Sequence, residues 1–326
     1  MTNILFYCPF NFNLKSTNLK SLGGIESLNL ELSKQLSKSN YKIFLATKCS
    51  KIIKKKNLIN IPIDFLLRDK SFYKFDKIIS SNDPTIFNHF KYSKNFLWLH
   101  NKLPIEKALR KKKFFSIIRN RISAIFVSNY LLKKTTNIYN FKQKIIIPNF
   151  LDTSFSNIKP QFNRKPYFVW SVQRKKGLKD VLNTWIKKIY TYKPDVKLYI
   201  FGLDKKDFHK KDIKTYLKYN IIFKGRVSKE KLKKHYNISM GMICLGYDET
   251  FCINAIEAFS CGLPIITFGL TALKELINKK NSFKIFNFNE FDKKILKILD
   301  MNKHQREHYI NYCYNFSKRY QIKKII

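Results

Sequence analysis

The sequence has 326 residues, of which 44% are hydrophobic and 26% are charged, and Lys plus Arg outnumber Asp plus Glu by 64 to 22. This length suggests two domains, and the apolar fraction excludes a chain that is disordered throughout. The net charge of +42 calls for a partner that carries phosphate, such as a membrane, a nucleic acid or a substrate.

The chain shows no sign of a membrane span or of a disulfide framework. No run of 18 apolar residues lacks a charge, and the N-terminal MTNILFYCPF resembles a first strand rather than a signal peptide. The six cysteines form no CxxC pair and lie mostly in apolar runs. Reduced, buried thiols in a cytosolic protein are therefore expected.

Short apolar runs alternate with longer amphipathic stretches from end to end, a rhythm typical of parallel, doubly wound sheets. In chain order, strands are predicted at Ile4–Cys8, Lys42–Thr47, Phe96–Leu99, Ala124–Ser128, Ile145–Pro148, Tyr167–Ser171, Lys197–Gly202, Ile221–Lys224, Met240–Leu245 and Pro264–Phe268. Helices are predicted over Ile25, Leu28, Leu32 and Leu36, and near Leu178–Tyr190, Ser228–Tyr236, Phe251–Ser260 and Thr271–Ile277.

Three prolines gather among polar residues near Phe150–Pro166, which we interpret as the joint between two such sheets. The prediction is an N-terminal domain at residues 1–152 and a C-terminal domain that begins at residue 153. Ligands of doubly wound folds bind at the carboxyl ends of the strands, so a cleft between the domains is the expected binding site.

Glycine is scarce, with nine residues in the whole chain, and the N-terminal half has only the adjacent pair Gly23-Gly24. This pair directly precedes the first predicted helix, where a glycine allows the backbone to approach a ligand closely. A tight loop without a ligand is the alternative.

The most specific pattern is a pair of glutamates, Glu249 and Glu257, with seven residues between them. Glu257 is predicted inside a helix that begins near Thr250 and is flanked by apolar strands. A carboxylate in such a place indicates binding, for example of ribose hydroxyls. The free amides of Thr250, Phe251 and Cys252 would then meet an anion or a sugar oxygen. The alternative is a helix-terminal charge at Glu249 and a structural ion pair at Glu257.

This stretch, followed by an Ala-x-x-x-Gly-x-Pro tail, resembles the signature of the retaining GT-B glycosyltransferases of group 1, or family 4. Further resemblances run in order through most of the chain, at Gly23–Glu26, Trp98–Asn101, Val127–Tyr130, Ile147–Asn149 and Phe223–Val227. The resemblance implies an α/β GT-B fold, in which two Rossmann-like doubly wound domains face a cleft. It also implies that residues 1–152 bind the acceptor, that residues 153–302 bind a nucleotide sugar, and that a helix at 303–326 packs back on the first domain.

The resemblance also implies roles for single residues. Glu249 would orient the donor sugar, His100 would contact its hydroxyls, and Gly225 would lie in the turn that binds the base. A satisfied histidine in the protein core is the alternative for His100.

The loop after Trp170 is the expected diphosphate site, because a basic run there precedes Gly177 at a helix start. Lys176 matches the family's second basic position, whereas Ser171 departs from the first. Arg174 is therefore predicted to supply the missing charge, and a solvated position is its alternative. These charges would remove the need for a divalent metal.

A further stretch, Lys107–Arg121, holds seven basic residues and no acid. As one helix it would place apolar residues on a single arc flanked by cations, which is the pattern of an interfacial membrane helix. The arc comprises Ala108, Phe114, Phe115, Ile118 and Ile122, and the anchor is predicted at Lys111, Lys112, Lys113, Phe114 and Phe115. In the alternative, Phe114 and Ile118 face the domain core.

The predicted function is therefore transfer of a sugar from a nucleotide-sugar donor to a glycan or lipid-linked acceptor, with retention of configuration and without a metal or cofactor. Its expected setting is the synthesis of cell-surface polysaccharide or lipopolysaccharide, at the cytoplasmic face of an anionic membrane and with no nucleic-acid partner. The alternatives are a basic nucleic-acid-binding protein, a nucleotide-sugar epimerase on the same fold, and a glycosyltransferase-like chain without activity.

Overall fold

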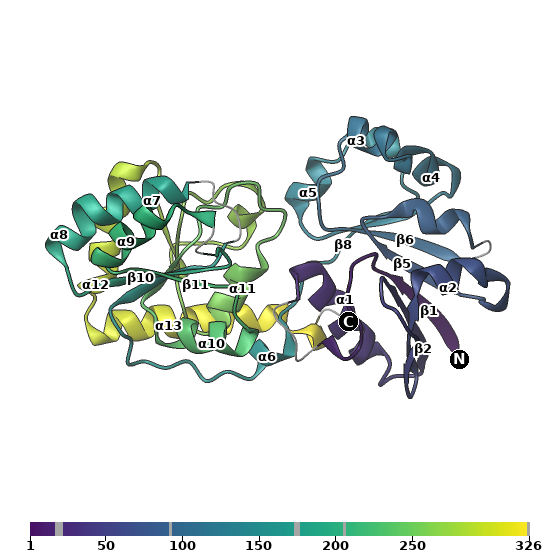
Figure 1. Cartoon of the computed structure of the whole chain (residues 1–326), viewed down its shortest axis with the longest axis horizontal. Coiled ribbons are helices and arrows are strands. Elements are labelled where there is room, and N and C mark those ends of the chain that lie inside the picture. The colour runs from purple at the N-terminus through teal and green to yellow at the C-terminus, as the bar shows by residue number, and fades with distance from the viewer. Residues whose placement is uncertain (17–21, 91–92, 173–176, 205–206, 325–326) are drawn as a thin grey trace. The chain divides into compact units, whose positions relative to one another are not determined.

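A computed structural model of the chain describes residues 1–16, 22–90, 93–172, 177–204 and 207–324. The chain divides into two compact units, Met1–Phe150 and Leu151–Lys324. Each unit is an α/β body with a parallel sheet between helices, as the sequence predicted (Figure 1).

Among its described residues, unit 1 holds a sheet of eight strands in the order β3-β4-β2-β1-β5-β6-β7-β8, and all neighbouring strands are parallel except β3 and β4. The strands are β1 Thr2–Tyr7, β2 Tyr41–Thr47, β3 Ile53–Lys55, β4 Leu58–Pro62, β5 Lys77–Ser81, β6 Lys94–Leu99, β7 Ser123–Phe126 and β8 Lys144–Ile146. The α-helices are α1 Gly24–Leu36, α2 Ile63–Arg68, α3 Ile105–Arg110, α4 Lys113–Arg119 and α5 Asn129–Lys133.

The predicted first helix is confirmed as α1, and it closes one face of this sheet. Leu30 joins a buried cluster with Ile4 and Phe6 of β1, and Leu32 packs against the edge of that cluster. Each fully buried side chain of this size contributes about 1.5–3 kcal/mol through loss of water contact, so the helical spacing of the leucines fixes which face of α1 meets the sheet.

Unit 2 holds a parallel sheet of six strands among its described residues, in the order β11-β10-β9-β12-β13-β14. The strands are β9 Tyr167–Trp170, β10 Lys197–Phe201, β11 Ile221–Gly225, β12 Gly241–Ile243, β13 Ile265–Thr267 and β14 Ser282–Lys284. The α-helices are α6 Thr153–Ser156, α7 Leu178–Thr184, α8 Tyr190–Tyr192, α9 Lys210–Lys218, α10 Lys229–Ile238, α11 Ile253–Ser260, α12 Phe291–Leu299 and α13 Lys303–Ser317.

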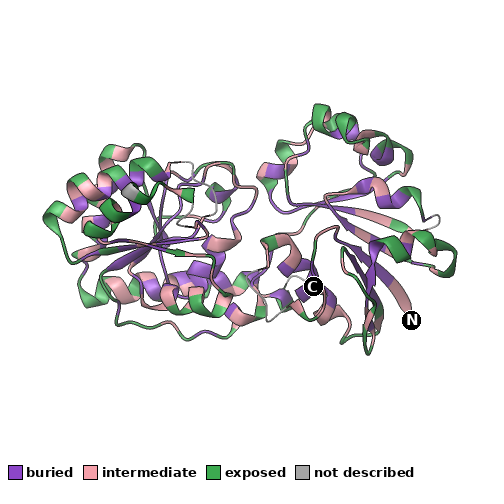
Figure 2. Ribbon diagram, viewed as in Figure 1, coloured by how far each residue is buried: buried purple, intermediate pink, exposed green. Residues whose placement is uncertain are grey.

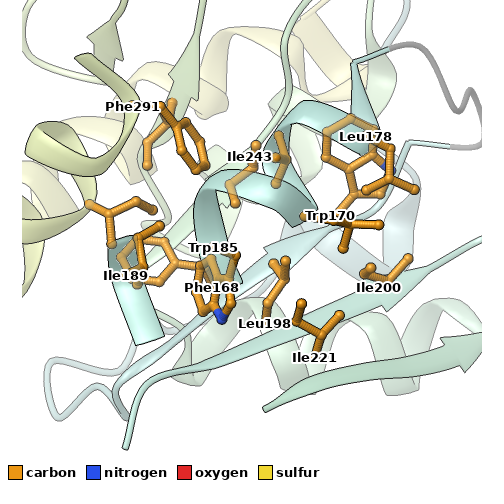
Figure 3. Packing of buried hydrophobic residues seen from close by; sticks show 14 of the residues in the cluster. Phe168, Trp170, Leu178, Trp185, Ile189, Leu198, Ile200, Ile221, Ile243 and Phe291 are labelled. Atoms are coloured by element: carbon orange, nitrogen blue, oxygen red, sulfur yellow. The ribbon is translucent and has the colours of Figure 1, made fainter. Parts of the chain in front are cut away.

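The core of unit 2 lies between this sheet and the helices α7 and α12, and Figure 3 shows its centre. Trp185 is fully buried, and its indole meets the Phe168 ring edge-on at 6.0 Å. Figure 2 shows the same arrangement throughout, with buried strands and with helices exposed on their outer faces. A packed core of this kind holds the strand ends, and thus the loops that follow them, in fixed positions.

All ten predicted strands are found, but three predicted helices differ. The segment Leu178–Tyr190 contains a π-helical turn at Trp185–Ile189, and Thr271–Ile277 forms only a 3-10 helix at Thr271–Glu275. The basic stretch is two helices, α3 and α4, rather than one, because Lys112 between them has a left-handed φ of 54°.

The closing helix α13 packs against α11 within unit 2, where the rings of Phe316 and Phe259 lie 5.6 Å apart. Its predicted packing on the first domain stays a prediction. Across the described ranges, no helix is long and apolar enough to cross a bilayer.

Candidate functional site

The strand order of unit 2 reverses between β9 and β12, which pair directly with each other. In doubly wound sheets, ligands bind at the carboxyl ends of the strands at this point, where the chain leaves in opposite directions. The loops that begin there are the one after Trp170 and the one from Cys244 to Cys252. The two loops therefore frame the candidate donor site.

The first loop starts at a neutral, buried residue. Ser171 is 5% exposed, and its hydroxyl shares a hydrogen bond with the Tyr236 hydroxyl, while its carbonyl accepts one from the Asn254 side-chain Nδ2. The position where the family resemblance implies a cation is thus filled by a hydroxyl held inside the protein. The predicted diphosphate ligands Arg174 and Lys176 lie outside the described residues.

Gly177 closes this loop and directly precedes α7 with a φ of +80°. A Cβ atom there would lie 2.4 Å from Cδ1 of Leu245, which belongs to the second loop. Only glycine combines this backbone conformation with such a close approach, so Gly177 brings the two loops together.

The second loop carries Glu249, which is half-buried and whose carbonyl accepts a hydrogen bond from the Ala272 amide. Helix α11 begins at Ile253, three residues later than predicted, because Cys252 takes a left-handed φ of 67° and cannot continue a helix. Thr250, Phe251 and Cys252 therefore lie in the loop before the helix.

The side chains of this loop point partly into the protein. The Phe251 ring is 4% exposed and packs against Tyr320 at 5.8 Å. The thiol of Cys252 lies 3.5 Å from that of Cys244. Because these two side chains are buried, only their backbone groups remain as the predicted ligands.

Glu257 lies on α11 and is 3% exposed. Its Oε1 atom lies 3.4 Å from Nζ of Lys229, the first residue of α10, and the same ammonium lies 3.0 Å from Oδ2 of Asp152. Burial raises the pKa of Glu257 above its usual range, and Lys229 acts in the opposite direction. For Asp152 burial also raises the pKa, but Lys229 and hydrogen bonds from Ser154 outweigh it and lower the pKa to about 2.

Lys229 and Asp152 are site residues that the sequence did not reveal. They are 77 residues apart, and the resemblance of Ser228–Glu230 to the start of the family's base-binding helix does not imply a carboxylate partner for Lys229. A second local signal is Ser228, which caps α10 by accepting a hydrogen bond from the Lys231 amide. That cap predicts where the helix begins but not what the next side chain contacts.

Arg164 binds the C-terminal ends of α10 and α11, the two helices that carry Lys229 and Glu257. Its guanidinium is buried and donates to the carbonyl of Tyr236 near the end of α10, at 2.8 Å, and to that of Cys261 after α11, at 2.7 Å. A cation is stabilised at helix C-termini, so Arg164 fixes α10 and α11 relative to each other.

Gly225 ends β11 at the same edge of the sheet, with a φ of +65°. A Cβ atom there would lie 2.9 Å from Oδ1 of Asp204, and the Gly225 carbonyl accepts a hydrogen bond from the Gly202 amide. The predicted base-binding turn therefore begins at a tight, glycine-dependent corner.

In unit 1, His100 follows β6 and is 4% exposed, with its ring 4.5 Å from that of Trp98. Its backbone amide donates to Oδ1 of Asn82, as does the amide of Asn101. Burial lowers the pKa of His100 to about 3, so its imidazole is neutral at physiological pH.

The glycine pair lies at the start of α1, where Gly23 precedes the helix. A Cβ atom on Gly23 would lie 2.4 Å from a carboxylate oxygen of Glu26. Gly23 has an ordinary negative φ, and the atoms it approaches lie at the end of a flexible side chain, so neither backbone conformation nor space requires a glycine here.

The predicted membrane residues divide into two groups. Lys113 and Phe114 face the protein: the Lys113 ammonium donates to the Asn82 carbonyl at 2.7 Å and pairs with Asp83 at 3.5 Å, while the Phe114 ring packs near Tyr139. Lys111, Lys112 and Phe115 are exposed. The predicted single arc was wrong, because Ala108 and Ile122 are fully buried on the two sides of a helix break.

Residues 152–316, just over half of the chain, match the family described as "Glycosyl transferases group 1". No curated protein sequence matches the chain.

Among solved structures, it resembles sucrose-phosphate synthase from Thermosynechococcus elongatus, with 14% identity, a TM-score of 0.74, and coverage of 100% of this chain and 96% of that one. It is also similar to WaaG, a glycosyltransferase involved in lipopolysaccharide biosynthesis, with 11% identity, a TM-score of 0.73 and coverage of 99% and 97%. A glycosyltransferase from Rickettsia africae is 14% identical, with a TM-score of 0.74 and coverage of 99% of this chain and 95% of that one.

These structural likenesses establish the fold, and the family match covers the unit that carries the glutamate pair. Together they decide between the transferase and its alternatives, nucleic-acid binding and epimerisation. The chain belongs to the group 1 glycosyl transferases, retaining and metal-independent enzymes of the GT-B fold that take a sugar from a nucleotide-sugar donor.

Proposed function

We propose that unit 2 binds the nucleotide-sugar donor at the switch point of its sheet, with Glu257 accepting hydrogen bonds from the ribose hydroxyls. The observation that carries this proposal is a carboxylate that is 3% exposed on a helix at the carboxyl edge of the sheet. Glu249, in the loop before that helix, would orient the sugar, and the turn at Gly225 would bind the base. The backbone groups of Thr250, Phe251 and Cys252 complete this set.

The negative charge of the departing diphosphate is offset in this proposal by Lys176 and Arg174, and by the amides at the start of α11. Donors that are oriented in advance toward developing charge contribute strongly to transferase rates, with losses of about 10²–10³-fold when one is removed. His100 contacts hydroxyls of the donor sugar as a neutral imidazole, which its low pKa supports.

The acceptor is a glycan or a lipid-linked glycan that binds to unit 1 near Gly23 and Gly24, in the synthesis of cell-surface polysaccharide or lipopolysaccharide. The exposed part of the α3–α4 segment would contact an anionic membrane at its cytoplasmic face. Leu109, Phe115 and Ile118 are 44%, 67% and 44% exposed, and exposed cations surround them in sequence. The likeness to a lipopolysaccharide glycosyltransferase is consistent with this setting.

Calorimetric titration with UDP, GDP and ADP tests the donor site. The nucleotide that binds the parent protein should lose about 10-fold or more in affinity in Glu257→Ala, because a buried carboxylate that accepts hydroxyl hydrogen bonds is removed. Glu230→Ala, an exposed glutamate on α10, is the matched control and should bind as the parent does. If Glu257→Ala binds the nucleotide as tightly as the parent does, Glu257 does not bind the ribose.

A further inference from the structure

We propose that Lys229 is a positioning residue of the donor site, which keeps the Glu257 carboxylate ionised and oriented, and that Asp152 holds Lys229 in place for this task. The inference deepens the proposed function and rests on the donor role of Glu257.

The geometry gives Lys229 two carboxylate partners of different closeness. Its ammonium makes a hydrogen-bonded ion pair with Asp152 at 3.0 Å and a longer ion pair with Glu257 at 3.4 Å. The nearer carboxylate therefore sets where the ammonium lies. Glu257 receives the favourable charge at one oxygen, Oε1, and the lone pairs that this contact does not use remain for the two hydroxyl donors of a ribose.

Burial explains why Glu257 needs such a partner. Its side chain is 5% exposed, and that of Lys229 is 24% exposed. An ionised carboxylate inside a protein is costly unless a cation or hydrogen-bond donors compensate it. Among the ion pairs of the described residues, Glu257 takes part only in the one with Lys229.

Asp152 is the second residue of unit 2. Its ion pair with Lys229 therefore connects the N-terminal segment of this unit to the proposed donor site. The Asp152 side chain also caps the short helix α6 by accepting from the Ser154 amide at 2.9 Å. The Lys233 ammonium on α10 donates to the Ser154 carbonyl at 3.0 Å. The entering segment is thus bound twice to α10, the helix that carries Lys229.

The other titratable groups described around Glu257 each keep one charge state across the tested pH range. Burial and the charge of Glu257 both raise the pKa values of Tyr236 and Cys261, to about 12 for Cys261, so both side chains stay protonated. Asp152 stays ionised with its pKa of about 2. Burial lowers the pKa of Lys229, but its two carboxylates outweigh that effect and raise it, so the ammonium persists.

The test is the affinity for UDP, GDP or ADP, whichever binds the parent most tightly, measured by calorimetry from pH 6 to pH 9. Lys229→Met keeps the length of the side chain and removes its charge, and Lys234→Met, an exposed lysine on the same helix, is the matched control. Every affinity is divided by that of the parent at the same pH, which cancels titration of the diphosphate.

We expect Lys229→Met to lose about 10- to 100-fold in affinity at pH 6, the size of a charged hydrogen bond, and to recover much of it by pH 9. Without the cation the pKa of Glu257 rises further, so the carboxylate is protonated at low pH and regains its charge at high pH. Lys229→Arg should restore the parent behaviour. A loss that is the same at every pH would mean a packing role, and affinity equal to that of Lys234→Met would mean no role; either result overturns the proposal.

Asp152→Asn keeps the helix cap and gives a second test that does not depend on the stability of Lys229→Met. It should weaken binding, and the double variant should bind no worse than Lys229→Met alone, because Asp152 acts through Lys229. Additive losses would contradict this coupling. Glu257→Ala distinguishes failure of the donor role of Glu257 from failure of the positioning role of Lys229. If Glu257→Ala leaves the nucleotide affinity unchanged, the donor role of Glu257 is refuted. If Glu257→Ala lowers the affinity but Lys229→Met does not, only the positioning role of Lys229 is refuted.

Discussion

His100 has a depressed pKa of about 3, so protonation of its ring opposes folding. In the unfolded chain a histidine binds its proton below a pH of about 6.5, whereas the folded protein holds this ring neutral until about pH 3. The contribution of His100 to stability is therefore complete above pH 6.5 and is lost progressively as the pH falls toward 3.

We predict that the melting temperature of the parent falls more steeply below pH 6.5 than that of His100→Gln, which does not titrate. The difference in free energy of unfolding should change by up to about 1.4 kcal/mol per pH unit in this range. Thermal unfolding at pH 7, 6 and 5 measures it. Parallel pH profiles of the two proteins would show that the imidazole is as accessible to protons as in the unfolded chain.

Single residues also show where sequence reasoning ends. The spacing of Glu249 and Glu257 was visible in one continuous stretch, and so was the glycine that ends α11. The partners of Glu257 were not, since Asp152 and Lys229 meet only after the chain has folded. Ser171 was recognised as a departure, but its bond with Tyr236 depends on β9 and α10 packing side by side.

At the scale of elements, central strands were predictable because they are continuous apolar runs. The strands missed are β3, β4, β5 and β14, which are short, interrupted by polar residues or at the sheet edge. The helix break at Lys112 was also missed. The sequence places no glycine or proline at this left-handed position, so no local signal marks it.

This break changes the surface that would meet a membrane. On α4, Phe115 and Ile118 are three residues apart and share an exposed face, with Arg119 one turn after Phe115 and the exposed Lys111 and Lys112 directly before the helix. Lys113 belongs to the turn at Asn82–Asp83 instead. A membrane test should therefore leave Lys113 intact.

We predict that the protein sediments with anionic phosphatidylglycerol vesicles and far less with phosphatidylcholine vesicles. Phe115→Ser/Ile118→Ser and Lys111→Glu/Lys112→Glu should each reduce the bound fraction, since basic residues near an anionic surface contribute up to about 1 kcal/mol each. The matched control is Phe72→Ser, which removes a phenylalanine that is 85% exposed on another segment. Binding by both α4 variants at the level of this control would exclude α4 as the contact surface.

At the scale of the whole molecule, the alternation of strands and helices was enough to predict two doubly wound units. Each unit has its own sheet and its own reversal of strand order. In our proposal the glutamate pair assigns the donor to unit 2, because Glu249 lies in the loop that follows β12 and Glu257 lies in the helix after that loop. The excess of 42 positive charges fits substrates and surfaces that carry phosphate.

The central claim is that the donor binds to unit 2, at the loops that follow β9, β11 and β12. Hydrogen–deuterium exchange of the full chain, with and without the nucleoside diphosphate that binds most tightly, tests it most directly, since bound ligand stabilises the backbone that it contacts. We predict slower exchange in the segments Gly225–Lys229 and Cys244–Glu257. Unchanged exchange in both segments at saturating nucleotide, with protection confined to residues 1–150, would contradict the account.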